Sequence, residues 1–268
     1  PAAVPRAPGV PRYNAPVKPR ILVTNDDGVL SEGIRALADA VAHLGEVTVV
    51  APIQEASAVG HALTLRRPLR VEELGNRTFA IDGTPTDCVN LAISHIIGHK
   101  PDLIVSGINK GWNIGDDVTY SGTVSGALEG ALLGIPGVAV STQNRRNTFA
   151  FEPAARAAAT VAEAVLVRGL PKFTFLNVNV PFAPPKGFRV TVQARRNHVT
   201  VVDERVDPRG RPYYWIEEGQ NQWEPHDRSD YQAVRDGYVS VTPLHPDMTA
   251  HGILDYVETL ALDAPAKV

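Results

Sequence analysis

The stretch Ile21-Leu22-Val23-Thr24-Asn25-Asp26-Asp27-Gly28 decides the fold class of this chain. Its first three residues form a short apolar run of the kind that builds a buried parallel strand. The run leads into two adjacent carboxylates and a glycine, at the point where open α/β sheets deliver the chain to their ligand sites. Because close carboxylates repel each other, such a pair usually holds a cation. The alternative for an isolated Asp-Asp-Gly is a solvated acidic turn, but its place directly after a strand favours a metal site.

Strand and helix patterns alternate from residue 20 to about residue 180, which predicts a doubly wound and mostly parallel sheet with helices on both faces. Ser31 is a suitable N-cap for the first helix, which we expect Gly45 to end. We expect strands at 21–23, 47–50, 63–71, 78–81, 102–106, 137–141 and 173–180, and helices at 84–95, 123–133 and 153–167.

The alternating strand and helix pattern ends near residue 180, where the chain contains Pro181, Pro184 and Pro185. Residues 199–202 and 212–216 flank a turn at 207–210, which predicts a long, projecting β-hairpin with an aromatic, partly exposed strand. We expect a short helix at 229–235, a strand at 238–242 and a last helical piece near 253–262. Because exposed aromatic hairpins commonly pair subunits, residues 181–268 are predicted to complete the fold and to form a C-terminal oligomerisation segment.

Composition narrows the functional classes. The 268 residues are 44% hydrophobic and 21% charged, as in ordinary soluble proteins. A net charge of −3 provides no basic field for nucleic acid or an anionic membrane. Cys88 has no partner cysteine, which fits a cytoplasmic compartment. No apolar run is long enough to cross a bilayer. Residues 1–19 are rich in proline and lack an apolar core, so we interpret them as an extended, disordered leader and not as a signal peptide.

Two further loops offer oxygen ligands. In the loop at 54–61, Ser57 could supply a hydroxyl oxygen to a hard cation, although a plain polar loop is the more common interpretation, with His61 packing or capping. In the glycine-rich loop at 106–115, Asn109 can offer a carbonyl oxygen, and Lys110 either balances phosphate charge or lies in solvent. Asp116 and Asp117 form a second carboxylate pair, for which loop capping is the favoured interpretation.

A fourth segment, residues 120–127, places small residues and hydroxyls before a predicted helix. Free N–H groups at a helix N-terminus attract anions, so Ser121, Gly122 and Thr123 suit a phosphate. The alternative is N-capping by Ser121 with close helix packing at Gly126 and Gly130.

The absence of other motifs narrows the choice further. The sequence has no Gly-x-Gly-x-x-Gly after the first strand, no Walker-type Gly-Lys-Ser/Thr and no Gly-x-Ser-x-Gly. The eight histidines include no His-x-His and no His-Glu-x-x-His, which argues against a histidine-rich zinc site. The remaining set is oxygen only, and such ligands suit Mg²⁺ or Mn²⁺: Asp26, Asp27, Ser57 and Asn109. An anion site beside the cation indicates phosphate chemistry.

Taken together, these motifs resemble those of one family, the survival protein SurE family of metal-dependent nucleotidases. The resemblance spans residues 20 to about 260. The motifs that carry it are, in order, 23–28 (VTNDDG), 83–89 (GTPTDCV), 106–109 (SGIN), 120–124 (YSGTV), 207–215 (DPRGRPYYW), 229–231 (SDY) and 239–244 (VSVTPL). It implies a phosphatase that acts on nucleoside 5′- and 3′-monophosphates, with short polyphosphate as a further candidate substrate. It also implies a Rossmann-like core, with a hairpin and C-terminal segment that pair or exchange between subunits of a homodimer or homotetramer. By the same resemblance, Asp26, Asp27, Ser57 and Asn109 bind the divalent metal, one ion per subunit.

One residue departs from the family pattern. The family usually has Ser-Gly in the second loop, whereas Ala58 follows Ser57 here. If that position needs a positive φ, alanine is costly and the loop changes its shape or mobility.

The mechanism we predict is attack of a metal-activated water on the phosphate. Ser121, Gly122 and Thr123 would hold the phosphoryl oxygens, with Asn113 in contact with phosphate or substrate. Asp26 or Asp27 is the candidate general base, and a covalent aspartyl-phosphate is the alternative route. Two rival functions remain open: a non-catalytic metal and nucleotide sensor, and a scaffold that binds partner proteins through the aromatic hairpin.

Overall fold

A nine-stranded sheet forms the centre of the computed structural model, which describes residues 18–197, 200–218 and 222–260. The strand order is β10-β13-β9-β6-β5-β1-β2-β4-β3. All neighbouring pairs are parallel except β13 with β9 and β3 with β4. The predicted mostly parallel α/β fold is therefore confirmed. The strands are β1 (Arg20–Thr24), β2 (Glu46–Pro52), β3 (Val71–Gly75), β4 (Thr78–Ile81), β5 (Leu103–Lys110), β6 (Gly137–Thr142), β9 (Phe175–Val180), β10 (Phe188–Val190) and β13 (Val239–Leu244).

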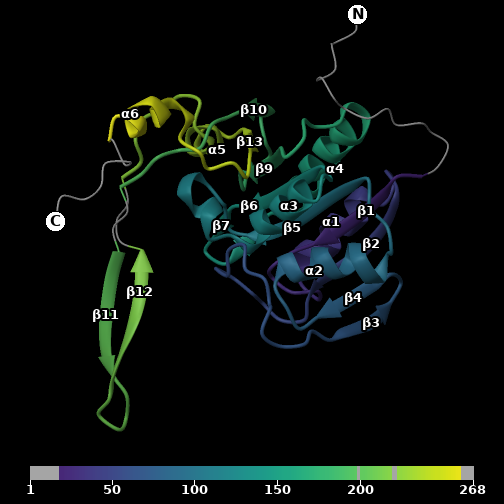
Figure 1. Ribbon diagram of the computed structural model, residues 1–268, viewed down its shortest axis with the longest axis horizontal. Helices are drawn as coiled ribbons and strands as arrows, with labels where there is room; N and C mark the ends of the chain where they lie inside the picture. The colour runs from purple at the N-terminus through teal and green to yellow at the C-terminus, as the bar shows by residue number, and fades with distance from the viewer. Residues whose placement is uncertain (1–17, 198–199, 219–221, 261–268) are drawn as a thin grey trace, which may run out of the picture.

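Helices cover both faces of this sheet (Figure 1). Helices α1 (Glu32–Val41) and α4 (Phe151–Arg168) pack on one face, and α2 (Pro85–Leu91) and α3 (Gly122–Leu132) on the other. Successive strand residues enter opposite cores, since Ile21 and Val23 join the α1/α4 cluster and Leu22 joins the α2 cluster. This double burial explains why the first strand is a continuous apolar run.

Several element boundaries differ from the prediction. The strand predicted at 63–71 is wrong, because residues 63–70 are irregular and β3 begins only at Val71. Leu63 and Leu65 do not pair with the sheet, and they are 49% and 83% exposed. Helix α1 ends at Val41, four residues before the predicted Gly45. Gly45 instead allows the chain to pass close to Pro19, since a Cβ at this position would lie 2.2 Å from the Pro19 carbonyl oxygen. Strand β5 continues past residue 106 to Lys110 because it stays paired with β6 as far as Thr142.

Short elements escaped the sequence patterns because they span too few residues to show a period. They are the 3-10 turn Gly115–Thr119, the β7/β8 pair (Asn144–Arg145 and Thr148–Phe149) and the edge strand β10. The helix predicted at 84–95 is present as α2 followed by the π-helical turn Ala92–Ile96. The C-terminal part contains α5 (Asp230–Arg235), a 3-10 turn (His251–Ile253) and α6 (Leu254–Glu258). The predicted residues 199 and 261–262 lie outside the described ranges.

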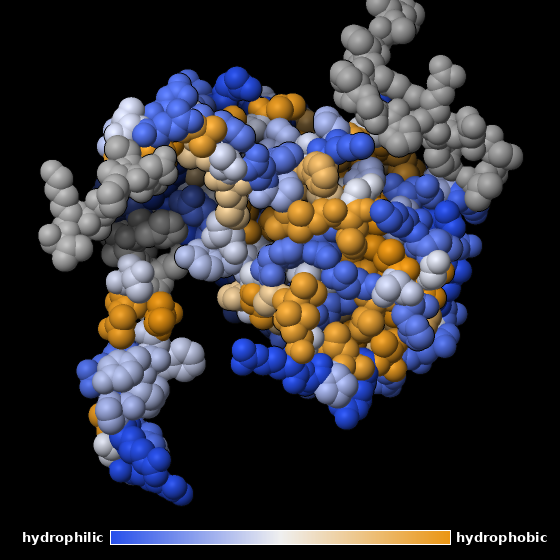
Figure 2. All heavy atoms as spheres, in the orientation of Figure 1, coloured by the Kyte–Doolittle hydropathy of each residue, from blue (hydrophilic) through white to orange (hydrophobic). Residues whose placement is uncertain are grey.

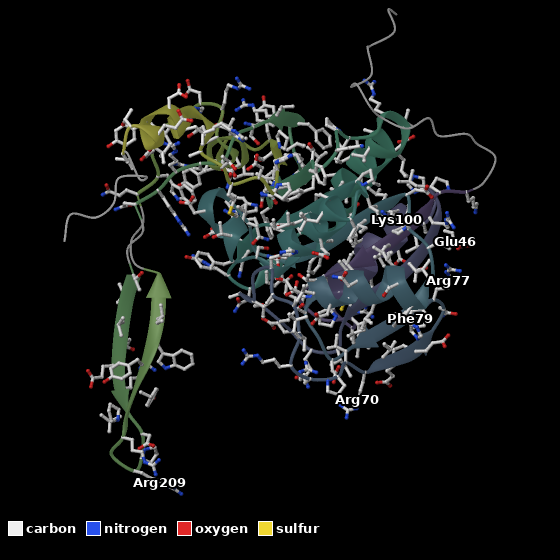
Figure 3. The ribbon with its side chains drawn as sticks, viewed as in Figure 1. Glu46, Arg70, Arg77, Phe79, Lys100 and Arg209 are labelled. Atoms are coloured by element: carbon white, nitrogen blue, oxygen red, sulfur yellow. The ribbon has the colours of Figure 1, made fainter. Side chains whose placement is uncertain are left out.

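The hairpin of β11 (Thr200–Val206) and β12 (Pro212–Glu218) projects away from the body, with Arg209 at its tip (Figures 1 and 3). Its apolar side chains face outward, as the hydrophobic spheres on the hairpin in Figure 2 show. In contrast, β10 and β13 come from the same C-terminal third and join the central sheet. Throughout the described ranges, every helix is too short or too polar to cross a membrane.

Candidate active site

Four segments meet in a cleft of about 490 Å³ beside the carboxyl ends of β1, β2 and β5. They are the loops after β1 and β2, the end of β5 with its following loop, and the N-terminus of α3. The cleft is lined by Asp26, Asp27, Glu55, Ser57, Ala58, Asn109, Lys110, Trp112, Asn113, Asp117, Tyr120, Ser121 and Phe149. A second cavity, of about 530 Å³ and bordered by Lys100 (Figure 3), contains none of the predicted site residues.

The loop after β1 is held by Asn25, which is fully buried. Its side-chain amide donates to the Gly28 carbonyl at 3.0 Å and to the Ser31 hydroxyl, the N-cap of α1, at 2.8 Å. Gly28 has a φ of +95°, which a side chain would oppose, and packs against the backbone of Gln54. The turn therefore fixes both aspartates against the start of the second loop.

Asp26 is 4% exposed and lies against the first turn of α3. The Thr123 hydroxyl donates to its Oδ1 atom. Burial raises the pKa of Asp26 to about 6, with repulsion from Asp27 adding to this and the hydrogen bond from Thr123 opposing it. In the metal-free protein, this carboxylate is therefore short of positive charge.

Asp27 is the second carboxylate of the pair, and its side chain is 5% exposed. The backbone N–H of Lys110 donates to Oδ2 at 3.2 Å, and the Lys110 ammonium lies 3.6 Å from Oδ1. Burial raises the pKa of Asp27, and the charge of Lys110 opposes the rise. Lys110 thus pairs with the aspartate, which the sequence alone did not predict.

Ser57 lies in the same cleft, at the start of the loop after β2. The neighbouring Ala56 N–H donates to the Asp26 carbonyl at 2.8 Å, which ties this loop to the first. The Ser57 hydroxyl donates to Glu55 at 2.7 Å, so the lone pairs of its oxygen remain available to a cation. Ala58 has a φ of +56°, so the position does require the left-handed backbone that alanine disfavours.

Asn109 contributes from the end of β5. Its side-chain amide donates to the Gly111 carbonyl at 2.9 Å, which fixes the orientation of this amide. Among the described residues, no hydrogen-bond donor contacts Asn109 Oδ1, so this oxygen can act as a ligand.

Asn113 is a buried junction in the loop that follows. Its backbone N–H donates to Asn179 Oδ1 at 2.8 Å, and its carbonyl accepts from the amides of Asn177 and Asn179 at 2.8 and 2.9 Å. Its side-chain amide donates to the Ser141 hydroxyl at 2.7 Å. Its backbone and amide are therefore fixed from β6 and β9.

The first turn of α3 shows the N-cap predicted as the alternative for this segment. Ser121 is the N-cap, since its hydroxyl oxygen accepts from Val124 N–H at 3.0 Å, and it also lines the cleft. Gly122 and Thr123 lie behind Asp26 and are absent from the cleft wall. A Cβ on Gly122 would lie 2.8 Å from the Asp26 Cβ, so glycine permits this close approach. Gly122 and Thr123 at the start of α3 therefore contact Asp26, whereas Ser121 lines the cleft.

The charges in the cleft fit a bound divalent cation. Asp26, Asp27, Glu55 and Asp117 bring negative charge to it, and among the described lining residues Lys110 brings positive charge. A phosphate dianion would be repelled unless a cation entered first. Within the described ranges, no cluster of three His, Cys, Asp or Glu side chains suits a metal. The donor set of two carboxylates, an amide oxygen and a hydroxyl fits a hard ion that also keeps water ligands.

Sequence reasoning did not anticipate several residues that shape the cleft. Asn177 and Asn179 position Asn113, and the alternating asparagines of a buried strand were the signal for them. Asp230, fully buried on α5, accepts from Gly115 N–H at 3.0 Å and Ala194 N–H at 2.9 Å and fixes the far end of the same loop. Trp112 donates to the Val180 carbonyl at 2.8 Å. These contacts join segments more than 30 residues apart, so the sequence does not show which partners these residues bind.

Comparison with known proteins identifies the family. The family model described as "Survival protein SurE" matches residues 21–200. A curated protein from Pelobacter propionicus, named "5'-nucleotidase SurE", is 52% identical over 242 residues, covering 89% of this chain and 98% of that protein. One from Geotalea daltonii with the same name is 53% identical over 233 residues, covering 86% and 94%.

A solved structure agrees with these sequence matches. The crystal structure of the SurE protein from Aquifex aeolicus superposes with a TM-score of 0.80 and 45% sequence identity, covering 90% of this chain and 99% of that one. Fold, motif positions and similarity over nearly the full length of the relatives lead to one conclusion: the chain belongs to the survival protein SurE family.

Proposed function

We propose that this chain is a 5′-nucleotidase, a divalent-metal-dependent phosphomonoester hydrolase. Its proposed substrates are nucleoside 5′- and 3′-monophosphates and short polyphosphate, and its cofactor is one Mg²⁺ or Mn²⁺ ion per subunit. The observation that carries the proposal is the convergence of Asp26, Asp27 and Asn109 with the N-cap of α3 in a single cleft. The relatives named 5'-nucleotidase support the reaction class.

Each group in the cleft has a role in this proposal. Asp26, Asp27, Asn109 and Ser57 would hold the ion, which supplies positive charge to the phosphoryl oxygens and lowers the pKa of a bound water. Either Asp26 or Asp27 takes a proton from the attacking water as the general base. The water oxygen bonds to phosphorus, the ester P–O bond breaks, and the leaving alcohol takes up a proton. Ser121 and the first N–H groups of α3 orient the phosphate, and Asn113 contacts the substrate.

Phosphate release tests this function. We expect purified protein with Mn²⁺ or Mg²⁺ to release phosphate from AMP, GMP and p-nitrophenyl phosphate, and chelation with EDTA to abolish the release. Asp26→Asn should lower kcat by at least about 100-fold, because it removes a charge that acts on the transition state. If metal-loaded wild-type protein bound AMP without turnover, the molecule would be a nucleotide sensor and the enzymatic proposal would be wrong.

The route of phosphoryl transfer has its own test. Direct attack by water leaves no phosphate on the protein, whereas an aspartyl-phosphate route leaves it on Asp26 or Asp27. Acid quench within milliseconds of mixing with labelled AMP, followed by mass spectrometry of the peptide 20–35, distinguishes the two. A phosphorylated aspartate would rule out direct attack.

Assembly and location complete the proposal. Exposed apolar side chains on β11 and β12, including Tyr214, Trp215 and Ile216, support a homodimer or homotetramer. A cytoplasmic location rests on the single cysteine, Cys88, and stays a prediction.

A further inference from the structure

The loop that carries Ser57 has little structure of its own. We call residues 53–64 the Ser57 loop; they contain no helix or strand between the end of β2 and residue 64. Ala56 is fixed by its hydrogen bond to the Asp26 carbonyl, and the Gly60 N–H donates to the Tyr120 carbonyl at 3.0 Å. The position of Ser57 therefore depends on where the neighbouring residues dock.

Two side chains of the Ser57 loop, all of it described by the structure, contact the body, those of His61 and Thr64. The Thr64 hydroxyl donates to Asp87 Oδ2 at 2.6 Å, at the far end of the loop. His61 is the nearer of the two to Ser57 in the chain. His61 Nε2 lies 2.6 Å from Glu129 Oε2, and with a proton on Nε2 the ring donates to the carboxylate. Glu129 is 7% exposed, and its other oxygen accepts from Asn90 Nδ2 on α2 at 2.7 Å. Although burial raises the pKa of Glu129, the hydrogen bonds from His61 and Asn90 and the charge of His61 hold it below the usual range. The acceptor is therefore an ionised carboxylate at neutral pH.

Helix α3 is a rigid support for this contact. It packs close to the sheet at Gly126, since a Cβ on this glycine would lie only 2.9 Å from both Ser106 Oγ and Thr24 Cγ2. The same helix carries Ser121 at its N-cap and Glu129 two turns later. One closely packed helix thus holds both a residue that lines the cleft and the anchor of the Ser57 loop.

We propose that His61, through its pairing with Glu129, is a positioning residue that fixes the Ser57 loop and sets the register of Ser57 relative to Asp26 and Asn109. The inference rests on the proposed metal site. It assigns to His61 a role in preorganising that site without touching metal or substrate, as outer contacts around metal ligands commonly do. His61 is 31% exposed at its side chain, so a packing role alone does not account for it.

A matched set of variants tests the proposal. His61→Ala removes the contact, and His61→Gln restores a donor that reaches a similar position. His43→Ala, an exposed histidine in the turn after α1, is the control. We expect H61A to weaken Mn²⁺ binding by about 10-fold, as measured by EPR titration, with kcat at saturating Mn²⁺ within about twofold of wild type. H61Q should recover most of the affinity, and H43A should be unchanged.

Hydrogen exchange supplies a readout independent of metal and activity. In EDTA-treated protein, H61A should lose amide protection over residues 56–62, and the amides of β1 and β5 should keep theirs. Glu129→Ala should give the same loss, and the H61A/E129A double variant should be no worse than either single variant, because all three lack the same pair.

Several results would overturn the proposal. They are unchanged Mn²⁺ affinity and exchange in H61A, failure of H61Q to recover the affinity, or additive losses in the double variant. If H61A failed to fold, H61Q and E129A would still decide. Absence of phosphate release by the wild type would instead refute the proposed function. The Mn²⁺ titration and the exchange data would still test the positioning role of His61.

Discussion

Asp26 shows at the scale of one residue how burial opposes the charge of a proposed metal ligand. Its pKa is raised from 3.8 to about 6 mainly because it is buried. A carboxyl group whose pKa is raised in the folded state favours folding while protonated, and that stability is lost as the pH rises from about 4 through 6. Above pH 6 the ionised, metal-free Asp26 therefore destabilises the fold.

Asp26→Asn is predicted to stabilise the metal-free protein while inactivating it. The rise of the Asp26 pKa from 3.8 to about 6 corresponds to about 3 kcal/mol at pH 8, or a rise in Tm on the order of 5 °C in EDTA. At pH 4 the difference between the two proteins should nearly vanish. Added Mn²⁺ should raise the Tm of the wild type more than that of D26N. Calorimetry at pH 4 and 8 measures this, and a lower Tm for D26N at pH 8 would contradict the assigned burial cost.

Ala58 is a second residue whose backbone opposes its side chain. At a φ of +56°, alanine costs about 1–2 kcal/mol relative to the right-handed region, partly offset by the greater chain entropy that glycine loses on folding. Ala58→Gly should therefore raise the free energy of unfolding by about 0.5–1 kcal/mol in urea titrations. Asn76→Gly, at another positive φ on the β3–β4 turn, should stabilise without changing Mn²⁺ affinity. Destabilisation by A58G would show that the loop relaxes to a different conformation.

At the scale of elements, strand β9 acts on the cleft from the neighbouring part of the sheet. Asn179 satisfies both the N–H and the carbonyl of Asn113, whereas Asn177 contacts only the carbonyl, and its own Oδ1 is buried without a partner. The two positions share one strand, one residue type and full burial, so they form a matched pair.

Asn179→Ala is predicted to cost more than Asn177→Ala. The first leaves the buried Asn113 N–H without its acceptor, at about 1–3 kcal/mol, and should lower kcat with stability because the cleft loop moves. Asn177→Ala removes one of the two amide donors to the Asn113 carbonyl, together with an acceptor that has no partner. It should therefore cost about 1 kcal/mol less than Asn179→Ala. Urea unfolding and steady-state kinetics of both variants measure the difference. Equal losses would mean that Asn113 is held mainly by other contacts.

Glycines on α1 and α3 allow these helices to pack close to strand β5. A Cβ on Gly33 of α1 would lie 2.2 Å from the Ile108 carbonyl oxygen, next to Asn109, and backbone cannot yield easily. A Cβ on Gly130 of α3 would lie 2.7 Å from the flexible end of Ile104. Gly33→Ala should thus destabilise by about 1–3 kcal/mol and weaken Mn²⁺ binding, and Gly130→Ala should affect stability less and binding not at all. Thermal melts with Mn²⁺ titrations check both, and a silent G33A would show that α1 can shift away from β5.

At the scale of the whole molecule, the hairpin has no core of its own. Tyr214, Trp215 and Ile216 are 58%, 55% and 79% exposed, and an isolated two-stranded hairpin is marginally stable in water. The proposed assembly would cover this apolar surface. The double variant Trp215→Ser/Ile216→Ser should therefore shift the protein toward monomer in light scattering, whereas Arg209→Ser at the tip (Figure 3) should not. A wild type that is strictly monomeric would contradict the assembly.

The sequence by itself determined the parallel sheet, the helices on its two faces and the location of the acidic loop. Apolar runs, 3.6-residue periods and caps such as Ser31 and Ser121 are local signals, and the structure retains them. Oxygen-bearing residues after successive strands also indicated a common edge of the sheet, because parallel strands end together.

Only the tertiary structure decided how those residues are held. The pairing of His61 with Glu129 spans 68 positions, and that of Asn113 with Asn179 spans 66. The left-handed backbone of Ala58, the irregular course of residues 63–70 and the turn of α3 toward Asp26 likewise depend on neighbours that are distant in the chain. Local propensity reports what a segment can form alone, whereas these features arise when buried polar groups must find partners across the fold.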